Sequence, residues 1–338
     1  MKISLDAGAL CVKGDQHFGN YTFTQNLIEG IYNFDKLNEY FIYSFCNKPD
    51  WLRLRKNIWF KHLRPVALWL SARVSIEEMK QKKDIFLALN QAIPLKTRSR
   101  VIAISHGLSY YFYPQFYPDS YHALKDELET MVKKSDLIIV ASRKVKSEMQ
   151  KLFPLLKNII TINYGVPLDM IKYEKSIREK YFLFCGMNNK IKNVEFVISC
   201  FKKFREIKRY SDFKLILVGP FAEYEDKNAG IEPHLVINRE VLRKLFCSAT
   251  AYLSASVYES FNFPVLEALA QNCPVIGLTS SIIPEFNPYV RLANQTQDFI
   301  DRMTDEADKP SQNNFRKKIL NKFSWEKYVK NLTELYQE

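Results

Sequence analysis

Apolar and polar residues follow two rhythms along the first half of the chain. Short apolar runs, typical of buried strands, lie at residues 3–6, 40–45, 84–89, 101–105, 137–141 and 159–162. Between them, residues 21–34 and 124–133 place apolar side chains every three to four positions, as an amphipathic helix does. Strands separated by helices predict a parallel sheet with crossover connections.

The second half of the chain repeats this pattern. Strands are expected at residues 181–185, 214–218, 251–254 and 274–278, and helices at 194–207, 239–246 and 264–270. The sequence therefore predicts a second doubly wound α/β unit. Because 338 residues exceed the size at which one core usually stops growing, two domains are the expected organisation.

The domain boundary is expected where the strand pattern lapses and charges accumulate, between residues 166 and 179. We therefore expect an N-terminal domain at 1–170 and a C-terminal domain at 171–315. The tail, 315–337, carries Trp325, Tyr328, Leu332 and Leu335 at helical spacing, which predicts one amphipathic helix that packs on a domain.

Composition is that of a globular protein, with 47% hydrophobic and 25% charged residues. The formal net charge of +12 favours anionic partners, namely nucleic acid, acidic lipid surfaces or phosphorylated ligands. No recognised nucleic-acid motif accompanies the charge, so we expect no nucleic-acid partner.

The cysteines and the N-terminal sequence predict the cellular compartment of the protein. No signal peptide and no transmembrane helix are expected, because the opening apolar stretch is short and no uncharged apolar run reaches about 18 residues. No two cysteines form a CxxC pair, and no His spacing completes a zinc site. We expect reduced thiols and a cytoplasmic protein, with any membrane contact peripheral. The six cysteines are Cys11, Cys46, Cys185, Cys200, Cys247 and Cys273.

Residues 51–64 interleave cations with aromatic side chains. Two interpretations stay open for this stretch. It lies on an acidic membrane surface, at the inner face of the membrane, or it is a solvated basic helix with one face in the core.

The strongest chemical signal lies where the strand expected at 251–254 leads into the helix expected at 264–270. Glu259 falls in the loop, and Glu267 follows one turn into the helix. Pro264 suits a first helical turn, and Asn262 tolerates a left-handed backbone. Ligands of parallel sheets bind at the carboxyl ends of strands, and a helix start with N–H groups and a positive dipole end suits a diphosphate.

Residues 258–270 resemble the E-x7-E motif of the retaining glycosyltransferases of family 4. Further matches occur in order at residues 1–31, 105–109 with 116–118, 136–142, 163–167, 184–193 and 323–325. The resemblance implies the GT-B architecture, in which two Rossmann-like domains face a cleft. It also implies that the C-terminal helix, at 316–338, crosses back to the first domain.

The resemblance also implies roles for individual residues. Glu267 would bind the donor ribose and Glu259 the transferred sugar, while Lys192 would neutralise the diphosphate. His106, from the first domain, would face the reacting sugar, so His106 and Glu259 are the catalytic candidates. The other donor-binding candidates are Gly186, Lys190, Ser260, Phe261, Asn262 and Phe263, and Gly19 and Asn20 are candidates for an acceptor or phosphate loop.

Each candidate also has a purely structural interpretation. His106 fits a structural histidine after a strand, Lys192 a surface lysine and Gly19 a turn glycine. Two positions depart from the family pattern. Met187 stands where the family offers Arg after the glycine, which leaves Lys190 to compensate without a bidentate guanidinium. Gly107 stands where related sequences often have Asp.

The expected reaction is retaining, metal-independent transfer of a hexose by front-face attack, with preorganised cations and N–H groups on the leaving diphosphate. The loops at His106 and 164–167 look most like those of bacterial polysaccharide mannosyltransferases. They imply GDP-mannose or a UDP-hexose as donor, and a glycan or lipid-linked oligosaccharide as acceptor in surface polysaccharide or lipopolysaccharide synthesis. No cofactor is expected. The alternative is a nucleotide-sugar-binding protein with little or no turnover, and the absent G-x-G-x-x-G fingerprint disfavours a nicotinamide-dependent enzyme.

Overall fold

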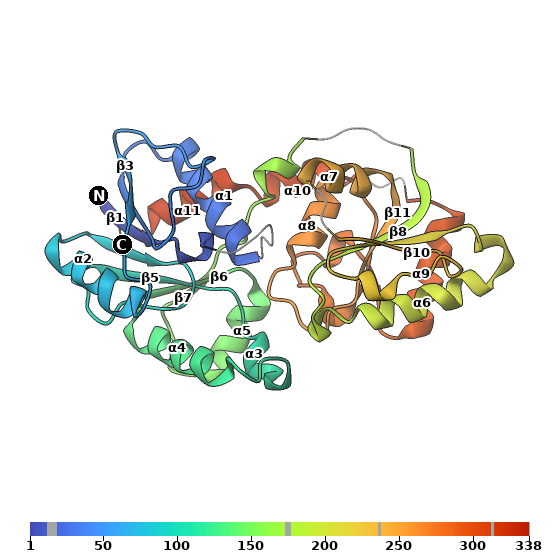
Figure 1. Ribbon diagram of the computed structural model, residues 1–338, viewed down its shortest axis with the longest axis horizontal. Helices are drawn as coiled ribbons and strands as arrows, with labels where there is room; N and C mark the ends of the chain where they lie inside the picture. The colour runs from blue at the N-terminus through green and yellow to red at the C-terminus, as the bar shows by residue number, and fades with distance from the viewer. Residues whose placement is uncertain (12–18, 173–176, 236–237, 312–313, 338) are drawn as a thin grey trace. The chain divides into compact units, whose positions relative to one another are not determined.

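Two units make up the chain in a computed structural model, which describes residues 1–11, 19–172, 177–235, 238–311 and 314–337. The first unit comprises Met1–Gly165 together with Ser324–Glu338, and the second comprises Val166–Phe323. Figure 1 draws both units, each built on its own sheet. No helix in the described ranges is long and apolar enough to cross a membrane.

The first unit is built on a seven-stranded sheet in the order β3-β2-β1-β4-β5-β6-β7. All neighbouring strands pair in parallel, and the strand order runs in both directions from β1, as predicted for a doubly wound sheet. The strands are β1 (Lys2–Asp6), β2 (Glu39–Ser44), β3 (Ile58–His62), β4 (Ile85–Ala88), β5 (Arg100–Ser105), β6 (Leu137–Val140) and β7 (Ile159–Thr161).

Helices cover both faces of this sheet. α4 and α5 pack on one face, and α1 and α11 lie side by side on the other (Figure 1). The helices are α1 (Gly19–Phe34), α2 (Ser75–Lys80), α3 (Ser109–Phe112), α4 (Tyr121–Lys134), α5 (Arg143–Leu152) and α11 (Trp325–Glu334). Single turns η1 (Gly8–Leu10) and η3 (Pro114–Phe116) and a π-helix, η2 (Trp69–Val74), complete the unit.

The second unit is built on a six-stranded parallel sheet in the order β10-β9-β8-β11-β12-β13. The strands are β8 (Glu179–Cys185), β9 (Lys214–Val218), β10 (Ile231–His234), β11 (Ala249–Ser254), β12 (Val275–Leu278) and β13 (Arg291–Ala293). The predicted second doubly wound unit is thus confirmed.

Apolar side chains of two helices, α6 and α9, share one core with the sheet of the second unit. α7 and α8 pack together, and α10 packs on α8 (Figure 1). The helices are α6 (Val194–Glu206), α7 (Arg239–Ser248), α8 (Phe263–Ala270), α9 (Thr296–Asp308) and α10 (Arg316–Lys322). Short turns are η4 (Leu168–Met170), η5 (Lys190–Lys192), η6 (Lys208–Tyr210), η7 (Ala222–Tyr224), η8 (Thr279–Ser281) and η9 (Asn287–Tyr289).

The tail differs from the single helix predicted at 315–337. It forms two helices, α10 in the second unit and α11 in the first, with a break at Phe323 and Ser324. Ser324 caps α11, because its Oγ accepts from the N–H of Lys327 at 3.3 Å. A helix cap therefore interrupts the apolar spacing, and α11 returns to pack on α1 as the family resemblance implied.

Residues 51–64 form no helix, so that expectation was wrong. They run as a loop into β3, the edge strand that pairs with β2. The strand pattern alternates, with Ile58 buried and Trp59 38% exposed, but the many cations made the stretch resemble a basic helix.

The expectation that all cysteines are reduced was also wrong. Cys11 and Cys46 form a disulfide, with their Cα atoms 5.4 Å apart. Cys11 follows β1 and Cys46 follows β2, so two neighbouring strands bring together residues that are 35 positions apart in the sequence. The cysteines therefore no longer support a reducing compartment, although the remaining four are free and buried.

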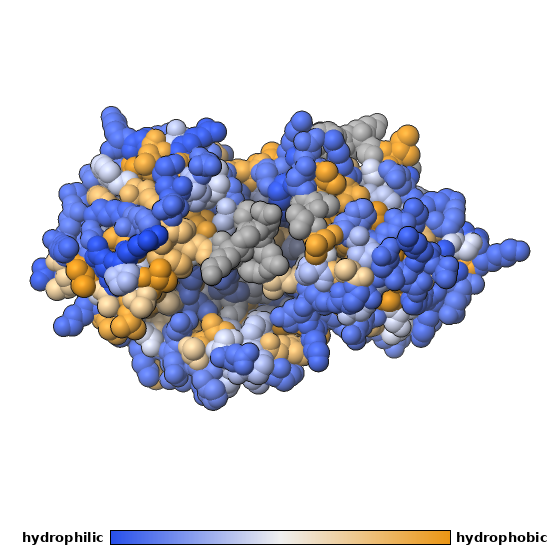
Figure 2. All heavy atoms as spheres, viewed as in Figure 1, coloured by the Kyte–Doolittle hydropathy of each residue, from blue (hydrophilic) through white to orange (hydrophobic). Residues whose placement is uncertain are grey.

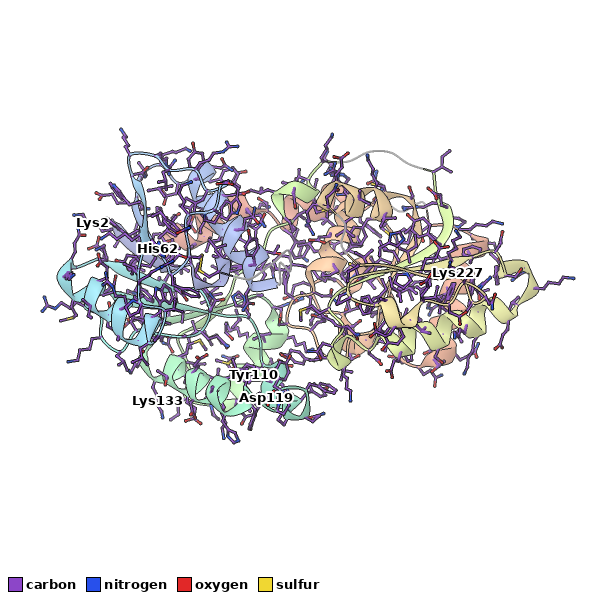
Figure 3. The ribbon with its side chains drawn as sticks, in the orientation of Figure 1. Lys2, His62, Tyr110, Asp119, Lys133 and Lys227 are labelled. Carbon is purple, nitrogen blue, oxygen red and sulfur yellow. A yellow bond between two sulfur atoms is a disulfide. The ribbon has the colours of Figure 1, made fainter. Side chains whose placement is uncertain are left out.

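Exposed basic side chains occur in both units, at positions outside the chemical signal. Lys133 of the first unit and Lys227 of the second have side-chain exposures of 75% and 87%, and Figure 3 labels both. The net charge therefore identifies no binding site by itself.

Candidate functional site at the carboxyl edge of the second sheet

Asn262 fixes the loop that carries the E-x7-E segment. Its backbone is left-handed, with φ of 70°, and its amide nitrogen donates to Ser254 Oγ and to the carbonyl of Ser281, both at 3.0 Å. Its Oδ1 accepts from the N–H of Val265 at 3.3 Å, which caps α8. The loop from β11 to α8 is therefore held at both ends by one predicted donor-binding residue.

The start of α8 differs in one respect from the expected phosphate cradle. Pro264 has no N–H, and the N–H of Val265 already donates to Asn262. The positive end of the helix dipole remains, but direct donation from these two positions does not. An anionic ligand at this position would therefore depend more on side-chain cations.

Lys192 is one such cation, and it forms a salt bridge with Glu259. Its Nζ lies 2.6 Å from Glu259 Oε1, which also accepts from Ser256 Oγ at 2.7 Å. Lys192 ends η5, after β8, and Glu259 follows β11, the strand beside β8. The structure thus brings together two candidates that are 67 positions apart in the sequence.

Backbone contacts join the same two loops. The N–H of Val257 donates to the carbonyl of Ile191 at 2.9 Å, and the Asn193 amide donates to the carbonyl of Ala255 at 3.1 Å. We call this region the donor edge, meaning residues 186–193 and 255–263 with the first turns of α7 and α8. The loops of the donor edge support each other, so its side chains are held in place before any ligand binds.

The remaining donor-binding candidates take different positions on the donor edge. Phe261 is only 2% exposed and packs with Phe286 and Phe323, so it offers its backbone rather than its ring. Lys190 is exposed, Met187 is 39% exposed, and Ser260 and Phe263 are half-buried.

The backbone of Gly186 lies close to a second glycine, Gly219, that the sequence interpretation missed. Gly219 has φ of +140°, and a Cβ there would lie 2.1 Å from the carbonyl oxygen of Gly186. Only glycine fits such a backbone beside such a neighbour. The Gly219-Pro220 turn after β9 was visible in the sequence, but its contact with Gly186 required the fold.

Gly219→Ala should therefore displace the Gly186 loop. We expect a loss of about 1–3 kcal/mol in stability, from backbone strain and overpacking, together with weaker nucleotide binding. Thermal unfolding with and without nucleotide measures both effects. Gly19→Ala is the matched control for stability, because a Cβ there meets no described atom within 4 Å. Equal melting temperatures for the two variants would contradict the proposed role of Gly219.

Glu267 is buried, with 3% exposure, and pairs with an arginine that the sequence interpretation did not single out. Arg239 Nη2 lies 2.7 Å from Glu267 Oε1, and Arg239 also forms a two-point contact with Asp169, at 2.7 and 3.1 Å. Burial raises the pKa of Glu267, and the Arg239 charge opposes that rise. An arginine at a helix start on the carboxyl edge was the available signal, since such positions favour anionic ligands.

His106 lies in the first unit with both ring nitrogens engaged. Nε2 lies 2.7 Å from the carbonyl oxygen of Leu89, so it carries the proton, and Nδ1 accepts from the Tyr164 hydroxyl at 2.9 Å. The ring also meets the Phe23 ring edge-on, with centroids 4.9 Å apart. Burial lowers the pKa of His106 to about 4, so the imidazole is neutral near pH 7.

The burial of His106 predicts how the stability of the fold depends on pH. Since the pKa falls from 6.5 to about 4 in the folded state, the neutral ring stabilises the fold above pH 6.5, and this stability is lost as the pH falls toward 4. Long-range ¹⁵N–¹H spectra against pH should show the Nε2–H tautomer and a pKa near 4. His106→Gln should weaken the loss of stability over the same pH window. An imidazole that titrates at 6.5 or above would contradict the described environment.

Gly19 and Asn20 begin α1, and both are exposed. The rest of the predicted glycine loop, residues 14–18, lies outside the described residues. The roles of Gly19 and Asn20 toward an acceptor or phosphate therefore stay predictions.

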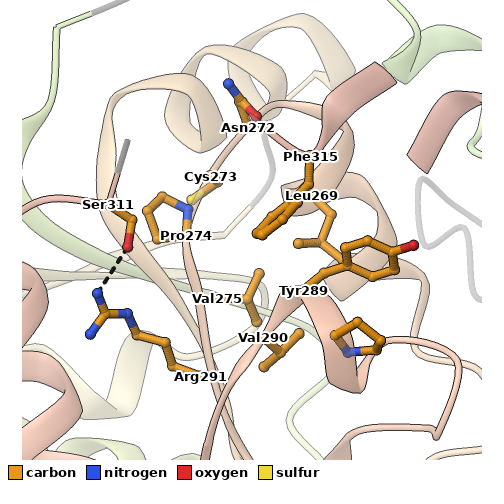
Figure 4. Close-up of a pocket in the computed structure, with 11 residues that line it drawn as sticks. Leu269, Asn272, Cys273, Pro274, Val275, Tyr289, Val290, Arg291, Ser311 and Phe315 are labelled. Carbon is orange, nitrogen blue, oxygen red and sulfur yellow. Dashed lines mark hydrogen bonds between the residues drawn. The ribbon is translucent and has the colours of Figure 1, made fainter. Parts of the chain in front are cut away.

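A pocket of about 120 Å³ lies at the opposite edge of the second sheet (Figure 4). Val275 begins β12 and Arg291 begins β13, so both mark the amino ends of strands. Arg291 is already bound to Glu306 at 3.0 Å and to Ser311 at 3.0 Å. This pocket is therefore separate from the donor edge.

Residues 179–305 match the sequence model of the family described as "Glycosyl transferases group 1". The chain is 26% identical over 241 residues to the O-antigen chain mannosyltransferase RfbU of Salmonella typhimurium, which covers 70% of this chain and 65% of that protein. It is 25% identical over 234 residues to the uncharacterized glycosyltransferase MJ1607 of Methanocaldococcus jannaschii, covering 59% of each. The matches thus span less than two thirds of the length of these relatives.

Solved structures share the fold over nearly the whole chain. Sucrose-phosphate synthase from Thermosynechococcus elongatus aligns with a TM-score of 0.77 at 15% identity, covering 99% of this chain and 98% of that one. HepE of Anabaena, in complex with UDP-glucose, aligns with a TM-score of 0.71 at 12% identity, covering 100% and 99%. These likenesses confirm the predicted GT-B fold, and the family match confirms the resemblance of the E-x7-E segment to glycosyltransferases.

Proposed function

We propose that this chain is a glycosyltransferase that moves a hexose, mannose in the first instance, from a nucleotide-sugar to a glycan or lipid-linked acceptor in surface polysaccharide synthesis. The observation that carries the proposal is the donor edge. Lys192 and Glu259 meet there beside the start of α8, and Glu267 lies one turn further with an oxygen available to a ribose. RfbU, a relative of this chain, is named a mannosyltransferase, and a solved HepE structure holds UDP-glucose.

Different charged groups would stabilise the leaving phosphate and contact the transferred sugar. Departure of a nucleoside diphosphate leaves negative charge on phosphate, and Lys192 with the α8 dipole would stabilise it. Glu259, held by Lys192 and Ser256, would then contact the transferred sugar. We propose retention of the anomeric configuration, with no metal and no bound cofactor, and a cytoplasmic site of action.

A thermal-shift panel of GDP-, UDP- and ADP-sugars tests the proposal. Stabilisation by sugars of one base identifies the donor class, because a ligand that binds only the folded state raises its stability. Transfer or hydrolysis of that donor, lost in Glu259→Ala, separates an enzyme from a binding protein without turnover. Met187 in place of Arg is the feature that favours this second candidate. No response to any nucleotide would contradict both.

The proposed membrane contact concerns residues 51–64. Leu54 is 46% exposed and Trp59 is 38% exposed, and cations surround both in the sequence. The visible surface is mainly hydrophilic, with apolar groups interspersed (Figure 2). Cosedimentation with anionic vesicles, compared with neutral ones, tests the contact, and Trp59→Ser should reduce it. Equal sedimentation with both vesicle types would contradict it.

A further inference from the structure

Arg239 links two carboxylates across three segments of the second unit. It is the first residue of α7, after Asn238 caps that helix by accepting from the Val241 N–H at 2.8 Å. Its Nε and Nη2 donate to Asp169, and Nη2 also donates to Glu267 on α8. Asp169 lies in η4, at the start of the second unit.

Asp169 itself is held by the same helix. Its backbone carbonyl accepts from Arg243 Nη1 at 3.1 Å, one turn after Arg239. The two-point contact between Arg239 and Asp169 fixes the plane of the guanidinium, because two parallel N–H donors match the two oxygens of a carboxylate. Arg239 therefore cannot rotate away from Glu267 without breaking the contact with Asp169.

The arrangement leaves one atom of each partner for a ligand. Within the described residues, Glu267 Oε2 and Arg239 Nη1 have no protein partner, and neither is a buried unsatisfied atom. Glu267 thus presents one oxygen as an acceptor while its other oxygen is held by the guanidinium. Ribose hydroxyls are donors that such an oxygen accepts.

Burial makes this support necessary. A carboxylate that is 3% exposed favours its neutral form unless a nearby cation stabilises the charge. Arg239 supplies that cation, since its charge opposes the rise in the pKa of Glu267 that burial causes. Without Arg239, Glu267 would be both uncharged more often and free to change rotamer.

We infer that Arg239 is a positioning residue for the donor, which holds Glu267 as an oriented acceptor for the nucleotide ribose, with Asp169 as its anchor. The inference rests on the proposed function of the donor edge. Arg239 acts through Glu267, so its contribution depends on the presence of both the Glu267 carboxylate and the ribose hydroxyls.

Calorimetric titration with UDP and GDP, and with their 2′,3′-dideoxy counterparts, tests this dependence. Arg239→Met should weaken binding of the better ribonucleotide about tenfold, the value of one hydrogen bond to a charged group. It should leave the dideoxy affinity nearly unchanged, so the preference for the ribose is lost. Arg239→Lys should restore part of that preference.

A double-mutant cycle then separates positioning from a general structural effect. In the Glu267→Gln background, Arg239→Met should cause no further loss of ribonucleotide affinity. Asp169→Asn should reduce the ribose preference with Arg239 still present, which keeps the test decisive if Arg239→Met does not fold. Arg209→Met, which breaks an exposed pair with Asp308, is the matched control and should leave affinity unchanged.

The outcomes distinguish this inference from the proposed function. If the wild-type protein binds neither nucleotide, the proposed function and the inference both fail. If the wild-type protein binds and Arg239→Met loses equal affinity for ribose and dideoxy ligands, the inference alone fails. Additive losses in the double variant would overturn it as well.

Discussion

Lys192→Met is expected to lower kcat by about 100-fold to 1,000-fold, the usual effect of removing one preorganised donor to a developing anion. The reason is that Lys192 is the cation paired with Glu259 on the donor edge, and the N–H groups of Pro264 and Val265 are absent or already used. The rate of transfer at saturating donor measures the effect.

Two further variants separate the causes. Lys192→Met also removes the cation that neutralises the buried Glu259 carboxylate, so Glu259→Gln in the same background should recover folding stability but not the rate. Lys202→Met removes an exposed pair with Asp226 in the same unit and should leave kcat unchanged. A Lys192→Met rate within threefold of the wild type would remove Lys192 from the mechanism.

Trp325→Ala is expected to cost about 3–5 kcal/mol of stability in the first unit, as large-to-small changes of buried aromatic residues do. Trp325 is 2% exposed and packs with Phe23, Tyr164 and Tyr328 between α1 and α11. Gly165 makes this packing possible, because a Cβ there would lie 2.5 Å from the backbone nitrogen of Trp325.

Hydrogen exchange locates that loss better than a single unfolding curve, because a chain of two units need not unfold in one step. Amides of α1 and α11 should exchange faster in Trp325→Ala, while those of the second unit stay protected. Trp59→Ala, on the edge strand β3, is the matched control and should change little. Unchanged protection of α1 would show that α11 does not complete the first unit.

The interior strands were predictable because each is buried on both faces and reads as one apolar run. Among the edge strands, β7 was predicted at 159–162, but β3, β10 and β13 were not. β10 contains Pro233 and polar residues, and β3 alternates buried Ile58 with exposed positions among cations. Edge strands tolerate proline and charge, so their sequences resemble loops or basic helices.

The E-x7-E segment was predictable from a local sequence, but its partners were not. Arg239 and Asp169 reach Glu267 through packing between α7, η4 and α8, which no spacing rule describes. The Cys11–Cys46 disulfide depends in the same way on the pairing of β1 with β2. Contacts between residues distant in the sequence follow from strand order, and the strand order is itself set by the whole fold.

Hydrogen exchange of the whole chain, with and without the nucleoside diphosphate that binds better, locates the nucleotide site. We expect the nucleotide to occupy the donor edge at the carboxyl ends of β8 and β11. We expect slower exchange on nucleotide addition at residues 186–193, 238–243 and 255–267. Protection confined to the opposite edge, around Val275 and Arg291, or no protection at all, would contradict the account.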